Sequence, residues 1–215
     1  MSEHTIADAN EHPIVEVPVI KPLRVRCARF ISNSLAPSTI SLPFVLLVSL
    51  SHSRSTISAL LFACLTLFFL TLGPMVYILI GVRKGWLSDV DVSRRIERPG
   101  PFLFGITSVA LGFVFLRYVN APKNLETLLL ITTISGVIML IVTLWWKISI
   151  HASSMAGVAT MLTALYGAIM LPTFLLLILV SWSRVVLRRH TTAQVIAGSL
   201  LSIALSASIL LLRGV

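Results

Sequence analysis

Long apolar runs, separated by short polar breaks, constrain the fold of this sequence more than any other feature. A membrane-crossing helix needs about 20 predominantly apolar residues. Seven runs approach or reach that length, and they cover residues 40–50, 57–82, 102–118, 127–146, 153–170, 171–187 and 192–212. The runs therefore predict an all-α bundle embedded in a membrane, with about six or seven transmembrane helices.

Proline and glycine predict where these helices bend. The first run is the shortest, so we expect its helix to begin near Ser32 and to bend around Pro37 and Pro43. Because proline lacks the backbone N–H that a helix interior needs, Gly73-Pro74 predicts a kink in the second run. For the same reason Pro172 is expected to separate the fifth run from the sixth.

Composition excludes the other broad classes of protein. Hydrophobic residues make up 56% of the 215 residues and charged residues only 12%, against about 25% charged residues in soluble domains. A soluble enzyme of this size could not bury so many apolar side chains. In a membrane protein the net charge of +9 indicates anionic head groups and phosphates rather than nucleic acid. We therefore expect membrane lipids and an amphiphilic phosphate as partners, and the oligomeric state stays open.

The positive charges divide unequally between the two sides of the predicted bundle. If all seven runs cross, thirteen Lys and Arg residues share the side of the N-terminus and four lie on the other side. The thirteen are Lys21, Arg24, Arg26, Arg29, Arg83, Lys84, Arg94, Arg95, Arg98, Lys147, Arg184, Arg188 and Arg189. The positive-inside rule then places this side in the cytoplasm. Residues 1–31 are expected to form a polar tail and a basic juxtamembrane segment, and residues 32–215 the membrane-embedded domain.

Three polar clusters fall at the ends of predicted helices on this basic side. The first is residues 89–99, DVDVSRRIERP, and the second is residues 147–151, KISIH. The third begins at Ser183-Arg184 and continues with His190 and Gln194. Ionisable side chains are costly at the membrane and mark functional sites. A bundle that brings the three clusters together would form one polar pocket.

The cations of these clusters suit the binding of a phosphate. Arg98 and Arg184 can each make bidentate contacts with phosphate oxygens, and Lys147 adds a positive charge. Arg95 is a further candidate cation, and Ser149 can add a donor to a developing oxyanion. We therefore predict a phosphate-binding pocket formed by these five side chains.

Two histidines lie among those cations. One histidine can attack phosphorus while the other protonates the leaving oxygen. Gln194 follows His190 by four residues, which places both on one face of a helix, where the amide carbonyl can accept from a ring N–H. His190, His151 and Gln194 are therefore the candidate catalytic residues, for phosphoryl transfer without a cofactor.

Together the clusters resemble the three-part signature of the type 2 phosphatidic acid phosphatase family, which shares its site with vanadium haloperoxidases. That signature is Lys, six residues, Arg-Pro; then Pro-Ser-Gly-His; then Ser-Arg, five residues, His, three residues, Asp. The matching residues here are Arg98-Pro99, Ser149, His151, Ser183-Arg184 and His190. The resemblance covers about residues 83–215 and implies that His190 is the nucleophile and His151 the general acid. It also implies that Arg98, Arg184 and Ser149 hold the phosphate.

The sequence departs from that signature at three places. Asp91 stands where the family has its lysine, and Gln194 stands where it has an aspartate. Ile148 and Ile150 replace the proline and glycine of the second motif. A neutral amide stabilises an imidazolium less than a carboxylate does, so slower turnover is expected. The pattern resembles a divergent branch with a Lys-Ile-Ser-x-His second motif.

The resemblance implies an integral membrane phosphatase that hydrolyses a lipid phosphate or a prenyl diphosphate through a phosphohistidine. Two alternatives stay open: a terpene synthase or prenyl-transfer enzyme that uses the same diphosphate pocket, and a lipid-binding protein without catalysis. Asp89 and Asp91 form an Asp-x-Asp pair of the kind that holds magnesium on a diphosphate in membrane prenyltransferases. Those proteins have two aspartate-rich loops, and only one is present here, so we expect no metal site.

Overall fold

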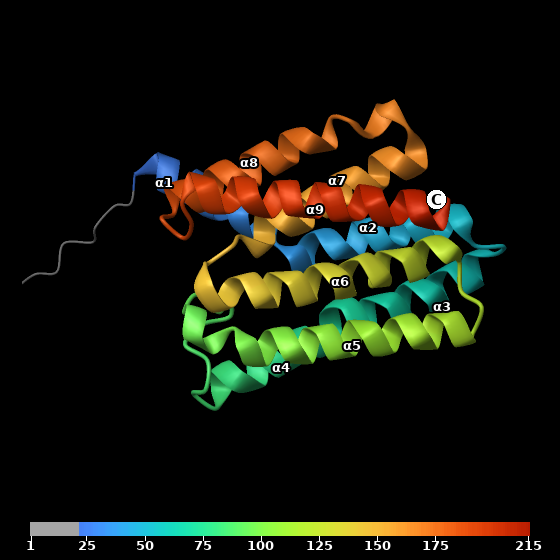
Figure 1. Ribbon diagram of the computed structural model, residues 1–215, viewed down its shortest axis with the longest axis horizontal. Helices are drawn as coiled ribbons and strands as arrows, with labels where there is room; N and C mark the ends of the chain where they lie inside the picture. Colours follow the sequence, from blue (N-terminus) through green and yellow to red (C-terminus); the bar gives the residue numbers. More distant parts are fainter. Residues whose placement is uncertain (1–21) are drawn as a thin grey trace, which may run out of the picture.

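A computed structural model describes residues 22–215, and this part of the chain is a bundle of α-helices with no β-strand (Figure 1). The predicted all-α class is confirmed. In chain order the helices are α1 (Leu23–Ser34), α2 (Pro37–His52), α3 (Thr56–Leu67), α4 (Gly73–Arg83), α5 (Pro99–Tyr118), α6 (Lys123–Trp145), α7 (Ile150–Tyr166), α8 (Thr173–Val186) and α9 (Thr192–Arg213). Three short turns accompany them: η1 (Phe68–Leu72), η2 (Arg95–Glu97) and η3 (Ala168–Met170).

Five helical stretches of the described chain are long and apolar enough to cross a membrane. They are Thr56–Arg83, Arg95–Tyr118, Lys123–Trp145, Ala168–Val186 and Thr192–Arg213. Helices α1 and α2 are bent by 44° relative to each other and add a sixth span if they are counted as one. Many large apolar side chains are exposed on the outside of the bundle, as a lipid-facing surface requires. These features indicate a membrane protein.

Helix α7 accounts for the difference between these five or six spans and the six or seven expected. The sequence predicts a span over residues 153–170, whereas α7 has 17 residues and ends at Tyr166. The following break is also wider than Pro172 alone predicts. It begins at Gly167, whose φ of +79° lies in the left-handed region that favours glycine. Helix α7 packs against α8 and α9, and half of its side chains face other helices rather than the outside.

The second predicted span changes its helical geometry at Gly73-Pro74. The backbone widens into the π-helical turn η1 directly before Gly73, and α4 continues beyond it. The ring of Pro74 would clash with a normal preceding turn, and the extra residue per turn relieves that clash. Ser108 of α5 donates a hydrogen bond to the carbonyl of Phe69 within η1 (2.8 Å), which fixes this turn against its neighbour.

The first helices differ from the expected domain division. The expected boundary after residue 31 falls inside α1, which runs without interruption from Leu23 to Ser34. Ser32 is buried and accepts a hydrogen bond from Arg184 of α8, so α1 belongs to the bundle. Pro37 is the first residue of α2, where its missing N–H needs no partner. The predicted tail at residues 1–20 and Lys21 lie outside the described residues.

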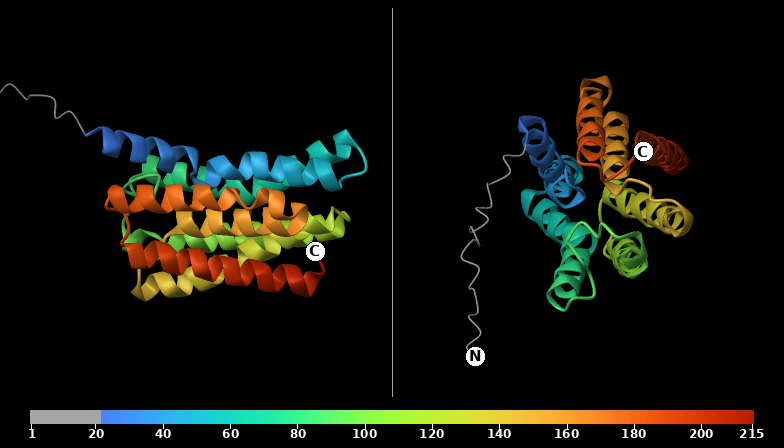
Figure 2. Two further views of the ribbon diagram at one scale, coloured as in Figure 1. Left: turned by 90° about the horizontal axis from the view of Figure 1, so that it is seen from above. Right: turned by 90° about the vertical axis from the view of Figure 1, so that its left-hand side faces the viewer.

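The helices run back and forth, so that four segments lie at one end of the bundle (Figure 1, left; Figure 2). These segments are the start of α1 and the connections α4–α5, α6–α7 and α8–α9. The three polar clusters occupy these three connections and the adjoining helix ends. We call this the polar end of the bundle. The fold therefore brings together residues that are about one hundred positions apart in sequence.

An ion-pair cluster joins three helices at the opposite end. Glu126 of α6 is 2% exposed, and its carboxylate lies 3.0 Å from the guanidinium of Arg213 at the end of α9. Arg117 at the end of α5 lies 3.6 Å from the same carboxylate oxygen. Arg213 also donates to the hydroxyl of Thr127 (3.2 Å). The cluster connects α5, α6 and α9 far from the polar end.

Replacing Glu126 by glutamine is expected to destabilise the protein by about 1–3 kcal/mol, because hydrogen bonds to charged groups contribute that much when they are buried. Thermal unfolding in detergent micelles measures the effect. The matched control is Arg117→Gln, whose side chain is 71% exposed and should matter much less. An unfolding temperature of Glu126→Gln equal to that of the wild type would contradict the role of the cluster.

Candidate functional site

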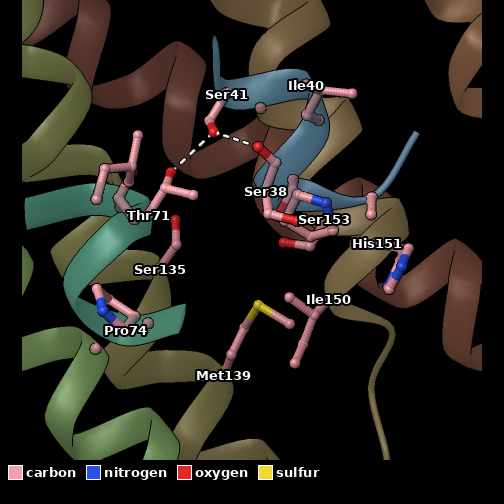
Figure 3. A pocket seen from close by; sticks show the side chains of 18 of the residues that line it. Ser38, Ile40, Ser41, Thr71, Pro74, Ser135, Met139, Ile150, His151 and Ser153 are labelled. Carbon is pink, nitrogen blue, oxygen red and sulfur yellow. Dashed lines mark hydrogen bonds between the residues drawn. The ribbon is translucent and has the colours of Figure 1, made fainter. Parts of the chain in front are cut away.

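A cavity of about 540 Å³ extends from the polar end into the bundle. Four predicted site residues line it: Arg98, His151, Arg184 and His190. The rest of its wall is mostly apolar, and the apolar lining residues include Phe44, Leu70, Val109, Ile131, Met139 and Met161. Figure 3 shows part of this wall, with His151 on one side and the side chains of Met139 and Ile150 between it and the deeper part. The cavity thus combines a cationic end with an apolar interior.

Arg98 connects the first two polar clusters. It precedes α5 as its N-cap residue and is 3% exposed. Its Nε donates to the carbonyl of Val92 and its Nη1 to the carbonyl of Ile148, both at 3.2 Å. These two bonds hold the α4–α5 connection against the α6–α7 connection. Arg98 also lines the cavity.

Arg184 comes from the last turn of α8 and is 4% exposed. Its Nη1 donates to the hydroxyl of Ser32 (2.7 Å) and lies 3.6 Å from a carboxylate oxygen of Asp91. Its Nε is buried and has no hydrogen-bond partner within residues 22–215. A buried N–H without a partner is unfavourable by about 1–3 kcal/mol, and more when the group is charged. This nitrogen has almost no accessible surface, so the side chain would have to shift before a ligand in the cavity could reach it.

His190 is fixed in one tautomer by its neighbours. Its Nδ1 lies 3.2 Å from the carbonyl oxygen of Lys147 and 3.2 Å from Oε1 of Gln194. The backbone N–H of Thr191 donates to the same Oε1 (3.1 Å), so the amide presents its oxygen to the ring. Both partners of Nδ1 are acceptors, which means that Nδ1 carries the proton. Nε2 then keeps its lone pair, on a residue that lines the cavity.

The surroundings of His190 keep it neutral. Burial, together with the positive charges of Arg184 and Arg98, lowers the pKa of His190 to about 4, because each disfavours the imidazolium. Burial and the charges of Arg98, Arg189 and Arg184 also lower the pKa of Lys147. At pH 7 the His190 ring is therefore neutral.

His151 lies in the first turn of α7, at the polar end of the bundle, and lines the cavity. Ser149 is the N-cap of this helix, and its hydroxyl accepts from the N–H of Ala152 (3.4 Å). The N-terminus of a 17-residue helix carries a partial positive charge that favours anions. His151 therefore adjoins two sources of positive charge, the helix end and the arginines.

The other predicted site residues lie around the cavity rather than in its wall. Gln194 contacts His190 as predicted, and Lys147 contacts His190 through its backbone carbonyl rather than its ammonium group. Ser149 is fully buried, with its hydroxyl at the helix cap. Arg95 points away, because its guanidinium donates to the carbonyl of Leu144 at the end of α6 (3.0 Å). Lys147, Ser149 and Arg95 thus do not contribute their side chains to the cavity lining.

Sequence reasoning missed two partners of Arg184. The sequence comparison showed that Asp91 stands where the phosphatase signature has a lysine, but it did not predict the pairing of Asp91 with Arg184. Ser32 lies 152 positions from Arg184, and no sequence signal connects the two. Asp89 accepts from the N–H and hydroxyl of Ser93 (3.3 and 3.0 Å). Within the described chain no three His, Cys, Asp or Glu side chains group as metal ligands would.

No family model matches this chain, and no curated protein or solved structure matches it either. Support for a function therefore comes from the residues and geometry of the chain itself.

The tautomer of His190 can be measured directly. We expect ring ¹⁵N shifts of histidine-labelled protein to show a neutral His190 with its proton on Nδ1 at pH 7, protonating with a midpoint near pH 4. Neutral His190 thus persists as the pH falls from 7 toward 4. The variant His190→Gln assigns the signal. A midpoint near the ordinary value of about 6.5, or a proton on Nε2, would contradict the described environment.

Proposed function

We propose that this protein is an integral membrane phosphatase that hydrolyses a lipid phosphate or a prenyl diphosphate through a phosphohistidine on His190, without a metal. The observation that carries the proposal is one cavity that joins a neutral histidine with a free Nε2 to two buried arginines and an apolar interior. The arrangement resembles that expected for a divergent type 2 phosphatidic acid phosphatase.

The substrate binds with its phosphate at the polar end and its tail in the cavity. Arg98 and Arg184, which both line the cavity, donate to the phosphate oxygens. The apolar wall takes the tail, because burial of apolar surface is favourable by about 25 cal/mol per Å². A soluble phosphate ester gains only the first of these contributions, so an amphiphile is the favoured substrate.

The proposed reaction transfers the phosphoryl group twice, first to His190 and then to water. Nε2 of His190 attacks the terminal phosphorus, an N–P bond forms, and the P–O bond to the leaving group breaks. Burial and the positive charge of Arg184 lower the pKa of His151 to about 3, so this ring is neutral in the free protein. It takes up a proton together with the anionic phosphate, whose negative charge favours the imidazolium, and gives that proton to the leaving oxygen. Water then attacks the phosphohistidine and gives a proton to His151, the N–P bond breaks, and inorganic phosphate leaves. The arginines stabilise the charge on the transferred group throughout.

Gln194 orients the imidazole of His190 but adds no negative charge beside it. Its oxygen accepts from Nδ1–H and so keeps the lone pair on Nε2. A carboxylate in this place would also stabilise the imidazolium that phosphorylation produces, and an amide stabilises it less. Slower turnover is the expected consequence. The basic polar end, and with it the site, is assigned to the cytoplasmic side by the positive-inside rule.

Phosphate release is expected when the purified protein is given phosphatidate, phosphatidylglycerol phosphate or prenyl diphosphates with a chelator present. His190→Ala should lower kcat by about a thousandfold or more, and His151→Ala by about 10²–10⁴-fold. His52→Ala is the matched control, because His52 ends α2 at the opposite end of the bundle.

Three outcomes would contradict the proposal. Loss of turnover with chelator would contradict the metal-free mechanism. Release of diphosphate together with a hydrocarbon would indicate a terpene synthase instead. Unchanged turnover in His190→Ala would remove the nucleophile and leave the lipid-binding alternative.

Asp91 competes with the substrate for Arg184. Its carboxylate is 42% exposed, so their ion pair is worth about 0–1 kcal/mol. Asp91→Asn is therefore expected to tighten inhibition by inorganic phosphate roughly two- to fivefold. Asp89→Asn is the matched control, because Asp89 accepts from Ser93 rather than from Arg184. Weaker inhibition in Asp91→Asn would show that the carboxylate assists phosphate binding.

A further inference from the structure

The α6–α7 connection, residues 146–149, holds two polar side chains of the cavity through its backbone. The carbonyl oxygen of Lys147 accepts from Nδ1 of His190, and the carbonyl oxygen of Ile148 accepts from Nη1 of Arg98, both at 3.2 Å. His190 and Arg98 are about ninety positions apart in sequence. Their placement relative to each other therefore depends on where this short connection lies.

The same connection lies directly on helix α9. The backbone N–H of Ser149 donates to the carbonyl of Gln194 in the first turn of α9 (3.4 Å). Gly198 follows Gln194 by four residues, so both lie on one face of the helix. Gln194 also accepts from His190. The face of α9 that meets the connection is thus the face that orients the histidine.

Gly198 leaves no room for a side chain at this contact. The carbon of a methyl group at Gly198 would lie 2.9 Å from the carbonyl oxygen of Ser149 and 3.4 Å from Cγ1 of Ile148. Even attractive C–H···O contacts keep carbon and oxygen about 3.3–3.6 Å apart. The crowded oxygen belongs to a backbone that three hydrogen bonds hold in place. It cannot move aside as the end of a flexible side chain could.

Backbone conformation gives no reason for a glycine at position 198. The residue lies inside α9 and its φ is not positive. Glycine in a helix interior is unfavourable relative to alanine. The close approach of the α6–α7 connection is the physical reason for a glycine here.

We infer that Gly198 is a positioning residue: its missing side chain lets the α6–α7 connection lie on α9, and the connection then holds His190 and Arg98 in one arrangement. A consequence for turnover rests on the proposed function. The consequence for the His190 ring does not, because it follows from the packing alone.

Gly198→Ala tests the inference through the state of that ring. The added methyl group pushes the connection off α9, separates Nδ1 of His190 from the carbonyl of Lys147 and admits water. Burial is the largest cause that lowers the pKa of His190 to about 4, and the carbonyl bond opposes it less strongly. We therefore expect the ¹⁵N titration midpoint to rise by about one unit or more. In the proposed reaction kcat should fall about a hundredfold, as a misplacement of about 1 Å can cause.

Gly112→Ala is the matched control for crowding alone. A methyl carbon at Gly112 of α5 would lie 2.6 Å from Cβ of Phe69 in η1, so this variant is also overpacked, but away from the α6–α7 connection. It should lower the unfolding temperature and leave the His190 midpoint near 4. A midpoint near 4 in Gly198→Ala, or an equal rise in both variants, overturns the inference.

Amide hydrogen exchange of the wild type is a second test, which decides even where a variant does not fold. The Ser149 amide is buried and donates across the contact to Gln194. It should exchange at least about a hundredfold more slowly than an unprotected amide. Rapid exchange at Ser149 would show that the connection does not lie on α9 and would overturn the inference.

The result is separable from the proposed function. Hydrolysis that depends on His190, with an unchanged midpoint in Gly198→Ala, would overturn this inference alone. A raised midpoint in Gly198→Ala, with no phosphate released by the wild type from any lipid phosphate or prenyl diphosphate, would overturn the phosphatase proposal and leave the role of Gly198 standing.

Discussion

Two buried guanidinium groups organise the polar end of this bundle. Arg98 donates to backbone carbonyls of two different connections, and Arg184 reaches a hydroxyl of α1 and a carboxylate of the α4–α5 connection. Each arginine therefore fixes segments that are distant in sequence. Two cations buried near each other are unfavourable unless negative charge accompanies them. Asp91 supplies part of that charge in the free protein, and a phosphate would supply the rest.

The same charges determine the state of His190. They keep the imidazole neutral, while Gln194 and the carbonyl of Lys147 direct its proton to Nδ1. A neutral ring with a free Nε2 beside two guanidinium groups is the arrangement that the proposed nucleophilic attack on phosphorus requires. In the proposed function, the apolar wall of the cavity favours amphiphilic substrates.

Local features of the sequence predicted much of the fold. The length of the apolar runs predicted most of the spans, and Gly73-Pro74 predicted an irregularity where the π-helical turn η1 lies, because both depend on neighbouring residues. The four-residue spacing of His190 and Gln194 likewise predicted their contact, since a helix turn sets it. The end of α7 and the wider break after Gly167 were not predicted, because α7 is defined by its packing against α8 and α9.

Contacts between distant segments could not be predicted. Nothing in the sequence pairs Ser32 with Arg184, or shows that α1 belongs to the bundle. Arg95 and Lys147 were predicted as site residues because of their charge, but charge does not show where a side chain points. The Arg95 guanidinium donates to the carbonyl of Leu144, and Lys147 contacts His190 through its backbone carbonyl.

In the phosphatase that we propose, His190 carries the transferred phosphoryl group, and this phosphohistidine can be trapped. Purified protein is mixed with a prenyl diphosphate labelled with ³²P on its terminal phosphate, in the presence of chelator, and quenched within milliseconds. We expect a label that is stable to alkali, labile to acid, and located on the peptide that contains His190. Inorganic phosphate formed without such a label, or a label on another residue, would contradict it.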